Sequence, residues 1–240
     1  MDFRKVRNTL MASVLALSLA GAAAAAPEGS SGGASELRGD TVEYDMKTGE
    51  MRATGNVVMK HNGTVAYCSV ATYNTNTQQG RMEGGVSADK DDMHLVCDVF
   101  YIDSQTAYRA EGNVQGTKVD RSFRGPRAEY FSDQDYLRMT EGGTITTADG
   151  VFNADFMEGW LQDNHCKGVG NAHIISPAKN FEGGGDTAEY FGKDSGRVVL
   201  TGNAWGVQNN NTLRSERLTV YLSDTGQAAV KPGDAAPAAE

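Results

Sequence analysis

Proline, cysteine and tryptophan are scarce in this sequence. Its 240 residues contain 5 Pro, 3 Cys and 2 Trp, and beyond residue 26 no apolar run approaches the roughly 20 residues that cross a bilayer. The odd cysteine count excludes a framework in which every cysteine is paired within the chain. Against so little proline, the 29 Gly and frequent Thr, Asn, Val and Tyr favour a soluble, turn-rich β protein.

Several functional signatures are also absent. The sequence has no His-Glu-x-x-His motif and no phosphate-binding loop, so we expect no catalytic residue, no metal and no cofactor. The net charge of −9 and pI near 5.0 argue against nucleic acid, whose binding depends on Lys and Arg. A carboxylate pair of the glycosidase kind remains an alternative, because some β-solenoids carry one.

The N-terminus predicts export. Arg4, Lys5 and Arg7 precede the apolar run Leu10–Leu19, and small residues 21–26 follow, as in a cleaved signal peptide over 1–26. Residues 27–36 read as a flexible linker and 231–240 as a disordered tail, which leaves a single folded domain over 37–230. We therefore expect a soluble, extracytoplasmic protein.

A repeat of about 29 residues runs through the folded part. Its first anchor is a Gly-Asn or Gly-Gly pair, whose first glycines are separated by 29, 28, 30, 28 and 32 residues. A second anchor is an acidic or small residue followed four positions later by an apolar one, as in Asp40/Tyr44 and Asp98/Ile102. Because both anchors stay in phase, the chain is predicted to be a stacked repeat protein.

Within each repeat the apolar residues alternate with period two, which indicates strands with one apolar face. About 13 mainly antiparallel strands spaced about 4.8 Å apart predict an elongated, all-β pair of stacked sheets. The inward positions used below are Val42, Tyr44, Val57, Met59, Tyr73, Val86, Ile102, Val114, Tyr130, Tyr190 and Leu200. From periodicity alone, packing in a dry core is the more economical interpretation of these residues.

The fourth repeat departs from the pattern. Leu137, Met139 and Ile145 predict a one-residue shift or bulge near Gly142-Gly143. Gly159 stands where the second anchor calls for an aromatic residue, and Trp160 comes one position late.

The cysteines and histidines suggest little chemistry. Cys68 and Cys97 are 29 residues apart at equivalent repeat positions, so a disulfide is expected if their strands pair directly. Cys166 is predicted to be a small buried apolar residue. His165, Cys166 and His173 match no standard zinc spacing.

The first repeat, Gly39-Asp40-Thr41-Val42-Glu43-Tyr44-Asp45 through Lys47-Thr48-Gly49 to Ala53-Thr54-Gly55-Asn56-Val57, resembles the repeat of the OstA-like/LptA family of periplasmic lipopolysaccharide-transport proteins. Glu111-Gly112-Asn113-Val114 and Asp186 to Tyr190 echo it, and the resemblance covers roughly residues 39–222.

The resemblance implies a β-jellyroll with a V-shaped groove whose inner face, formed by the inward positions above, holds the acyl chains of lipopolysaccharide. It further implies end-to-end strand addition with inner-membrane and outer-membrane transport components, and head-to-tail self-association. Neither the outer-membrane barrel nor the retained anchor of other members is evident, which favours a soluble bridge. The alternatives are a structural or adhesive β-solenoid with a dry core and, less favoured, a carbohydrate-active enzyme.

Overall fold

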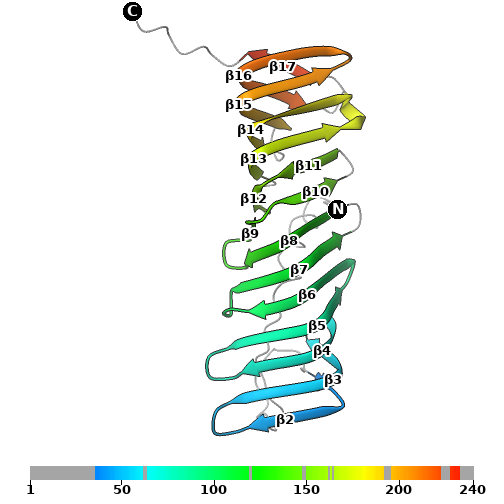
Figure 1. The fold of residues 1–240 in the computed structure, drawn as a ribbon, viewed down its shortest axis with the longest axis vertical. Helices are drawn as coiled ribbons and strands as arrows, with labels where there is room; N and C mark the ends of the chain where they lie inside the picture. Colours follow the sequence, from blue (N-terminus) through cyan, green and yellow to red (C-terminus); the bar gives the residue numbers. More distant parts are fainter. Residues whose placement is uncertain are drawn as a thin grey trace, which may run out of the picture. The chain divides into compact units, whose positions relative to one another are not determined.

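The computed structural model describes residues 36–61, 64–118, 121–147, 150–161, 163, 165–191, 196–222 and 228–232. These residues form seventeen β-strands and one short 3-10 helix, η1 (Pro177–Lys179). Every strand pairing for which a register is given is antiparallel, so the predicted all-β fold is confirmed (Figure 1). No helix within the described ranges is long and apolar enough to cross a membrane.

The chain divides into two compact units, one of residues 1–119 and 124–135, the other of residues 120–123 and 136–240. Unit 1 contains β1 (Glu36–Arg38), β2 (Thr41–Asp45), β3 (Glu50–His61), β4 (Thr64–Asn74), β5 (Gln79–Lys90), β6 (Met93–Ile102), β7 (Ala107–Lys118) and most of β8 (Arg121–Phe131). Both β1 and β2 pair with β3, and from there each strand pairs with the next along the chain as far as β7.

Unit 2 contains β9 (Tyr136–Met139), β10 (Gly143–Thr147), β11 (Gly150–Ala154), β12 (Phe156–Trp160), β13 (His165–Ser176), β14 (Phe181–Phe191), β15 (Arg197–Gln208), β16 (Asn211–Leu222) and β17 (Ala228–Pro232). Here β9 pairs with β12 and β10 with β11, and both β11 and β12 pair with β13. The strands from β13 to β17 then pair in chain order.

The two sequence anchors meet in space and form a corner in every repeat except the fourth. In β3 both Gly55 (φ 72°) and Asn56 (φ 46°) adopt the left-handed conformation, which glycine and asparagine tolerate best. The Asn56 side-chain amide donates to the Asp40 carboxylate at 3.1 Å, and the Asp40 backbone N–H donates to Gly55 O at 2.8 Å. The same Asn-to-Asp bond recurs at Asn113/Asp98, Asn171/Asp155 and Asn203/Asp186.

Each corner is also a β-bulge. Between the pairs Thr54↔Val70 and Val57↔Cys68, the two residues Gly55 and Asn56 face the single residue Ser69. The β5–β6, β13–β14 and β15–β16 pairs shift register in the same way at their anchors. The in-phase anchors of the sequence are therefore the two sides of one bulge, repeated at each corner.

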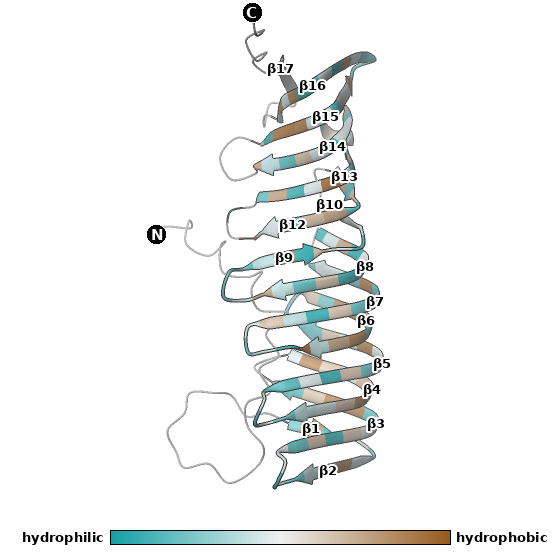
Figure 2. Ribbon diagram, turned by 60° about the vertical axis from the view of Figure 1, so that its left-hand side comes forward, coloured by the Kyte–Doolittle hydropathy of each residue, from teal (hydrophilic) through white to brown (hydrophobic). Residues whose placement is uncertain are grey.

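The corners divide each unit into two layers. Layer A holds β2, β9, β12 and β17. It also holds the residues before the corner in β3, β5, β7, β13 and β15, and those after it in β4, β6, β8, β14 and β16. Layer B holds the other strand residues. Contacts cross between the layers: Leu200 of layer A reaches towards Gly183 of layer B, and Phe152 of layer B towards Gly168 of layer A. Hydropathy alternates along the strands accordingly (Figure 2), and the inward residues form an apolar core in each unit.

The fourth repeat is interrupted, which is a larger departure than the predicted one-residue shift or bulge. The chain leaves β9 at Met139 and enters β10 only at Gly143, with Gly142 left-handed (φ 83°) between them. Leu137 and Met139 face inward and are buried, as the alternation predicted. Gly159 is buried on the inner face, while Trp160 lies on the outer face and stacks on His165 with ring centroids 4.6 Å apart.

Three predicted strands are divided at their anchors, into β1/β2, β9/β10 and β11/β12, and β17 is additional, so seventeen strands stand where about 13 were expected. The strands begin at Glu36 and end at Pro232, slightly outside the predicted bounds of 37–230. The predicted signal peptide, residues 27–35 of the linker and residues 233–240 of the tail lie outside the described residues.

Candidate functional site

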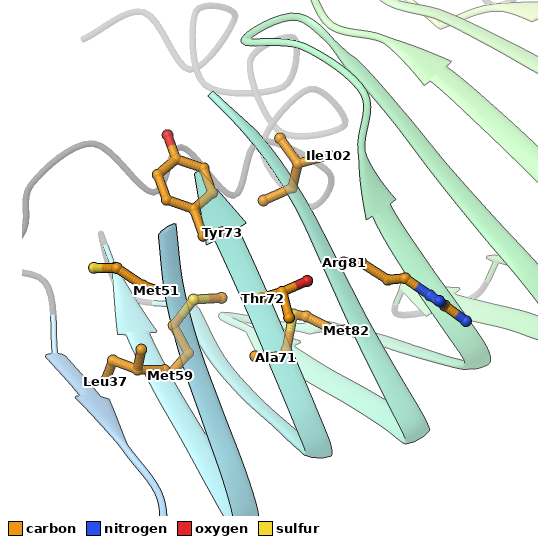
Figure 3. A pocket seen from close by; sticks show the side chains of 9 residues that line it. All are labelled: Leu37, Met51, Met59, Ala71, Thr72, Tyr73, Arg81, Met82 and Ile102. Atoms are coloured by element: carbon orange, nitrogen blue, oxygen red, sulfur yellow. The ribbon is translucent and has the colours of Figure 1, made fainter. Parts of the chain in front are cut away.

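A small apolar hollow, partly open to solvent, lies between the two layers of unit 1, close to β2. Figure 3 shows Leu37, Met51 and Met59 gathered on one side and the Arg81 side chain pointing away. Leu37 of β1 and Met59 belong to layer B, and the other lining residues belong to layer A, so both layers contribute. The lining residues are Leu37, Met51, Met59, Ala71, Thr72, Tyr73, Arg81, Met82 and Ile102.

The floor of the hollow is buried and its mouth is open. Tyr73, Met82 and Ile102 are buried, whereas Leu37 and Met51 are half-exposed. Beside them, β2 presents Val42, 50 % exposed, and Tyr44, 47 % exposed, which lie opposite Ala53 and Met51 on the inner face. Met46 in the following turn is 78 % exposed. The hollow thus continues into an exposed apolar patch at the edge of the sheet.

This edge is acidic on its other side. Asp40, Glu43 and Asp45 are all exposed, and Glu43 lies opposite Arg52 of β3. Two backbone N–H groups, those of Lys47 (2.8 Å) and Thr48 (3.2 Å), donate to the Asp45 carboxylate, and these bonds lower its pKa. A strand approaching β2 therefore meets apolar side chains on one face and negative charge on the other.

The predicted groove residues all belong to the inner face, but the layers cover most of them. Buried positions in unit 1 are Val57, Met59, Tyr73, Val86, Ile102, Val114 and Tyr130. In unit 2 Leu200 is fully buried and Tyr190 is half-exposed. Val42 and Tyr44 alone among the eleven are exposed. Contact with a lipid stays a prediction for all of them.

The inward tyrosines turn their hydroxyl groups towards the margin of the core. Tyr108 donates to Gln105 O at 2.6 Å, and Tyr130 donates to the buried Asp135 carboxylate at 2.8 Å. Burial raises the pKa of Tyr73, Tyr108 and Tyr130, and for Tyr130 the Asp135 charge adds to the effect. The buried polar or charged residues in the described chain are Thr64, Glu129, Asp135 and Ser176, so the interior offers little to a polar ligand.

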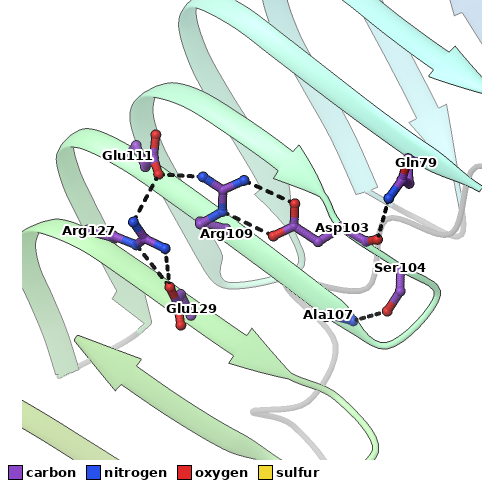
Figure 4. Close-up of polar contacts among 8 residues, drawn as sticks. All are labelled: Gln79, Asp103, Ser104, Ala107, Arg109, Glu111, Arg127 and Glu129. Atoms are coloured by element: carbon purple, nitrogen blue, oxygen red, sulfur yellow. Dashed lines mark hydrogen bonds and ion pairs between the residues drawn. The ribbon is translucent and has the colours of Figure 1, made fainter. Parts of the chain in front are cut away.

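Charged residues lie on the outer face of layer A. Figure 4 shows a chain of ion pairs in which Arg109 bridges Asp103 and Glu111, while Arg127 bridges Glu111 and Glu129. The Arg109 guanidinium also stacks 3.9 Å from the centroid of the Tyr101 ring, and its bonds to Asp103 and Glu111 raise its pKa. This network reinforces pairing between neighbouring strands and leaves the inner face apolar.

The predicted Cys68–Cys97 disulfide is wrong. Both residues are free thiols, on β4 and β6, and β5 runs between those strands. Two strand spacings of about 4.8 Å exceed the reach of a disulfide. Burial raises the pKa of Cys68 to about 11 and that of Cys97 to about 12, so both stay protonated at neutral pH.

Cys166 is half-buried, whereas a buried position was predicted and Cys68 and Cys97 are buried. It is a free thiol on the inner face of β13, and desolvation raises its pKa to about 12. Its neighbour His165 lies on the opposite face with Nε2 2.8 Å from Glu189 Oε1, and His173 is 2.9 Å from Glu182 Oε1. The three residues therefore do not converge on a common point.

Sequence reasoning missed two residues of the hollow's mouth. Leu37 fell at the predicted boundary of the fold, and only its pairing with Met59 places it on the inner face. Met51 was not among the predicted inward positions, and its exposure depends on how far β2 covers it. The alternation of Glu36-Leu37-Arg38 was the one available signal for β1.

No protein-family profile matches the chain, and no curated protein matches it. Among solved structures, the chain is similar to the crystal structure of LptH from Pseudomonas aeruginosa, described as the LptA-homologous periplasmic component of the lipopolysaccharide transport device. The match has 12 % sequence identity and a TM-score of 0.29, and covers 59 % of this chain and 94 % of LptH. LptH thus comes from the family whose repeat this sequence resembles, while the proposals below rest on the geometry of this chain.

Proposed function

We propose that this protein is a non-catalytic carrier of lipopolysaccharide in the periplasm, which holds the acyl chains between its two layers. The observation that carries the proposal is the apolar hollow of unit 1, which opens beside the exposed inner face of β2. A small apolar hollow that continues into an exposed apolar patch is a place where a ligand with a long hydrocarbon part could begin to enter.

The energetics favour such a carrier. A 12-carbon chain exposed to water costs roughly 9 kcal/mol at about 0.8 kcal/mol per CH₂, so crossing an aqueous compartment needs a cover. The lining of Met51, Met59 and Met82 suits this role, because the flexible thioether side chain adapts to irregular partners. Carriage breaks no covalent bond, so no catalytic group is required.

The hollow is too small for a whole acyl chain, so we propose that the two layers separate when lipid binds. The buried residues Val57, Val86 and Val114 continue from the hollow along the inner face of layer B, where each repeat places a residue of similar shape. In the proposed loaded state, acyl chains replace contacts between the layers at these positions. The corners remain intact because their hydrogen bonds lie on the outside of the bend.

The partners are proposed to be inner-membrane and outer-membrane components of the same transport route. β2 pairs with β3 on one side, and its other edge offers backbone groups for strand addition. A partner strand with apolar residues facing inward would cover Val42 and Tyr44, and basic residues facing outward would match Glu43 and Asp45.

Photo-crosslinking tests the proposal with a matched pair of positions. A photoreactive residue at Tyr44 points to the inner face, and one at Glu43 points outward from the same strand. Lipopolysaccharide should be captured from Tyr44 and from Val57, and not from Glu43. Capture from Glu43 alone would contradict the proposal.

A dry-core structural solenoid is the second candidate, and the burial of most inward residues favours it. It predicts no capture from any inner position. A fluorescent fatty-acid probe separates the two candidates further, because a dry core leaves its emission unchanged while a carrier gives a saturable signal that lipopolysaccharide displaces.

A further inference from the structure

The layer-A edge of unit 1 at β2 differs from the layer-A edge of unit 2 at β16. At the β2 edge the inward residues Val42 and Tyr44 are 50 % and 47 % exposed. At the β16 edge the inward residues Leu218 and Val220 are 3 % and 0 % exposed. The edge of unit 1 is therefore open and that of unit 2 is covered.

The closing element is β17. It pairs antiparallel with the layer-A half of β16, from Leu218↔Pro232 to Leu222↔Ala228. In the described chain the layer-B half of β16, Asn211–Arg217, pairs with β15 alone, and all seven of its residues are exposed. At the β16 edge, layer A therefore extends one strand further than layer B.

β17 has the features by which natural sheets blunt an edge. It is five residues long and contains Lys231 and Pro232. Short edge strands and proline disfavour the addition of a further strand because they present fewer backbone hydrogen-bonding groups, and lysine disfavours it through the charge of its side chain. β2, also five residues long, contains neither lysine nor proline.

Strand direction does not by itself close the β16 edge. The segment β1–β2 runs from layer B to layer A, and β16 runs the same way. A second copy that laid its β1–β2 edge on β16 with the layers matched would form a parallel pair, which is only slightly less stable per residue than an antiparallel one. Such a copy would need the Leu218–Leu222 edge, which β17 occupies.

We propose that β17 is a self-supplied cap, which prevents head-to-tail growth of this chain from the β16 edge and leaves β2 as its open docking edge. The inference rests on the strand addition proposed above and specifies its regulation. The chain then acts as a single carrier or as a terminal member of an assembly, and displacement of β17 is the step that allows another strand to join β16.

Sedimentation velocity over a range of protein concentrations tests the cap. The unmodified chain should keep one sedimentation coefficient at all concentrations. The double variant Ala229→Pro/Val230→Pro removes backbone donors from β17, and its weight-average mass should rise with concentration by about twofold or more. Ala238→Pro, which lies beyond β17, is the matched control and should behave as the unmodified chain.

A second variant guards against an effect of proline on folding. A chain ending at Leu222 lacks β17 altogether, and its circular dichroism should show retained β structure together with the same concentration-dependent growth. Self-association of the unmodified chain, or concentration-independent mass in both uncapped variants, overturns the cap.

Lipid capture from Tyr44, measured on the same samples, distinguishes failure of the carrier function from failure of the cap. Capture without growth in the uncapped variants leaves the carrier function and removes the cap. Growth without capture leaves the cap and removes the carrier function.

Discussion

The corners of unit 1 and the interrupted repeat of unit 2 use related sequences with different results. In unit 1, β3 and β7 run through Gly-Asn corners without a break, and β5 does so through Gly84-Gly85. In unit 2, one strand is interrupted at Gly142, between β9 and β10, and another at Asp155, between β11 and β12. Two consecutive left-handed residues opposite one residue keep a strand continuous, whereas a single left-handed residue at Gly142 does not.

The Asp-Asn hydrogen bond has a different role at a continuous corner and at an interrupted one. At Asp98 the bond to Asn113 supports a corner that the backbone pairing of β6 already holds on both sides. At Asp155 the same bond, 2.7 Å to Asn171, supports the place where β11 ends and β12 begins. Side-chain hydrogen bonding therefore matters most where the ladder of backbone bonds is interrupted.

Alkaline pH should affect the two units unequally, and this is the largest effect we expect. Unit 1 contains two thiols with raised pKa values, about 11 for Cys68 and about 12 for Cys97, and the raised tyrosines Tyr73, Tyr108 and Tyr130. Unit 2 contains Cys166, at about 12. Each group binds its proton more tightly in the folded state. Its contribution to the free energy of unfolding is therefore complete below the pKa of the unfolded state and is lost as pH rises through the pKa of the folded state.

Between pH 8 and pH 11 the free energy of unfolding should fall by about 2 kcal/mol for each thiol, because one pKa unit corresponds to about 1.4 kcal/mol. Hydrogen exchange monitored by mass spectrometry should show β4–β8 opening at lower pH than β13–β16. Replacing Cys68 and Cys97 by Ala removes the titrating groups and should reduce the difference. Equal opening of both units would count against this account.

Gly112→Ala should be the most damaging single substitution at a corner. Gly112 has φ +72°, and an added Cβ would lie 2.2 Å from Asp98 Oδ2. The left-handed conformation costs about 1–2 kcal/mol, and displacing Asp98 loses its bond to Asn113, so the total should be about 3 kcal/mol.

Gly85→Ala is the matched control for that substitution. Gly85 has a similar φ of +79°, but an added Cβ meets nothing within 4 Å, so the cost should be about 1 kcal/mol. Urea unfolding of both variants measures the difference. If they prove equally stable, the Asp-Gly contact contributes nothing to the corner.

Asp155→Ala should destabilise the protein by about 2 kcal/mol, compared with about 1 kcal/mol for Asp98→Ala. Both substitutions remove one carboxylate that accepts from an asparagine amide, but only Asp155 lies between two separate strands. Thermal unfolding of the two variants side by side gives the comparison. A larger loss for Asp98→Ala would reverse our explanation of the interrupted repeat.

Gly85→Asn should be slightly stabilising, by about 0.5 kcal/mol. The substitution gives this repeat the Gly-Asn pair of the other corners, at a position where an added side chain has open space. Asparagine tolerates the left-handed conformation and reduces the conformational freedom of the unfolded chain. Denaturant unfolding in triplicate resolves a change of this size. A destabilised variant would show that Ser69, which donates to Gly84 O at 2.8 Å, requires the second glycine.

Much of the inner face could be predicted from alternation. Val57, Val114 and Leu200 are buried where period two placed them, because a pleated strand has only two faces. The sequence could not show that β5 separates Cys68 from Cys97, since equal spacing in a repeat does not tell which strands are neighbours. Nor could it show that Val42 and Tyr44 are exposed, because exposure depends on what lies beyond the last strand.

β17 was missed for a related reason. Residues near 231 have the composition of a tail, and a five-residue strand has too few positions to display a period. Only pairing with Leu218–Leu222 makes it a strand. The interruption at Gly142 was indicated by the loss of phase around Leu137 and Met139, but its form was set by the separate partners of β9 and β10.

By itself the sequence determined the repeat, the strands and the inward face of each, because local backbone preferences and alternation act over a few residues. The tertiary structure decided which anchors meet, how the edges of the sheet end and where the interior stays open. Those features depend on contacts between residues far apart in the chain, as when Asp40 meets Asn56 and β17 covers β16.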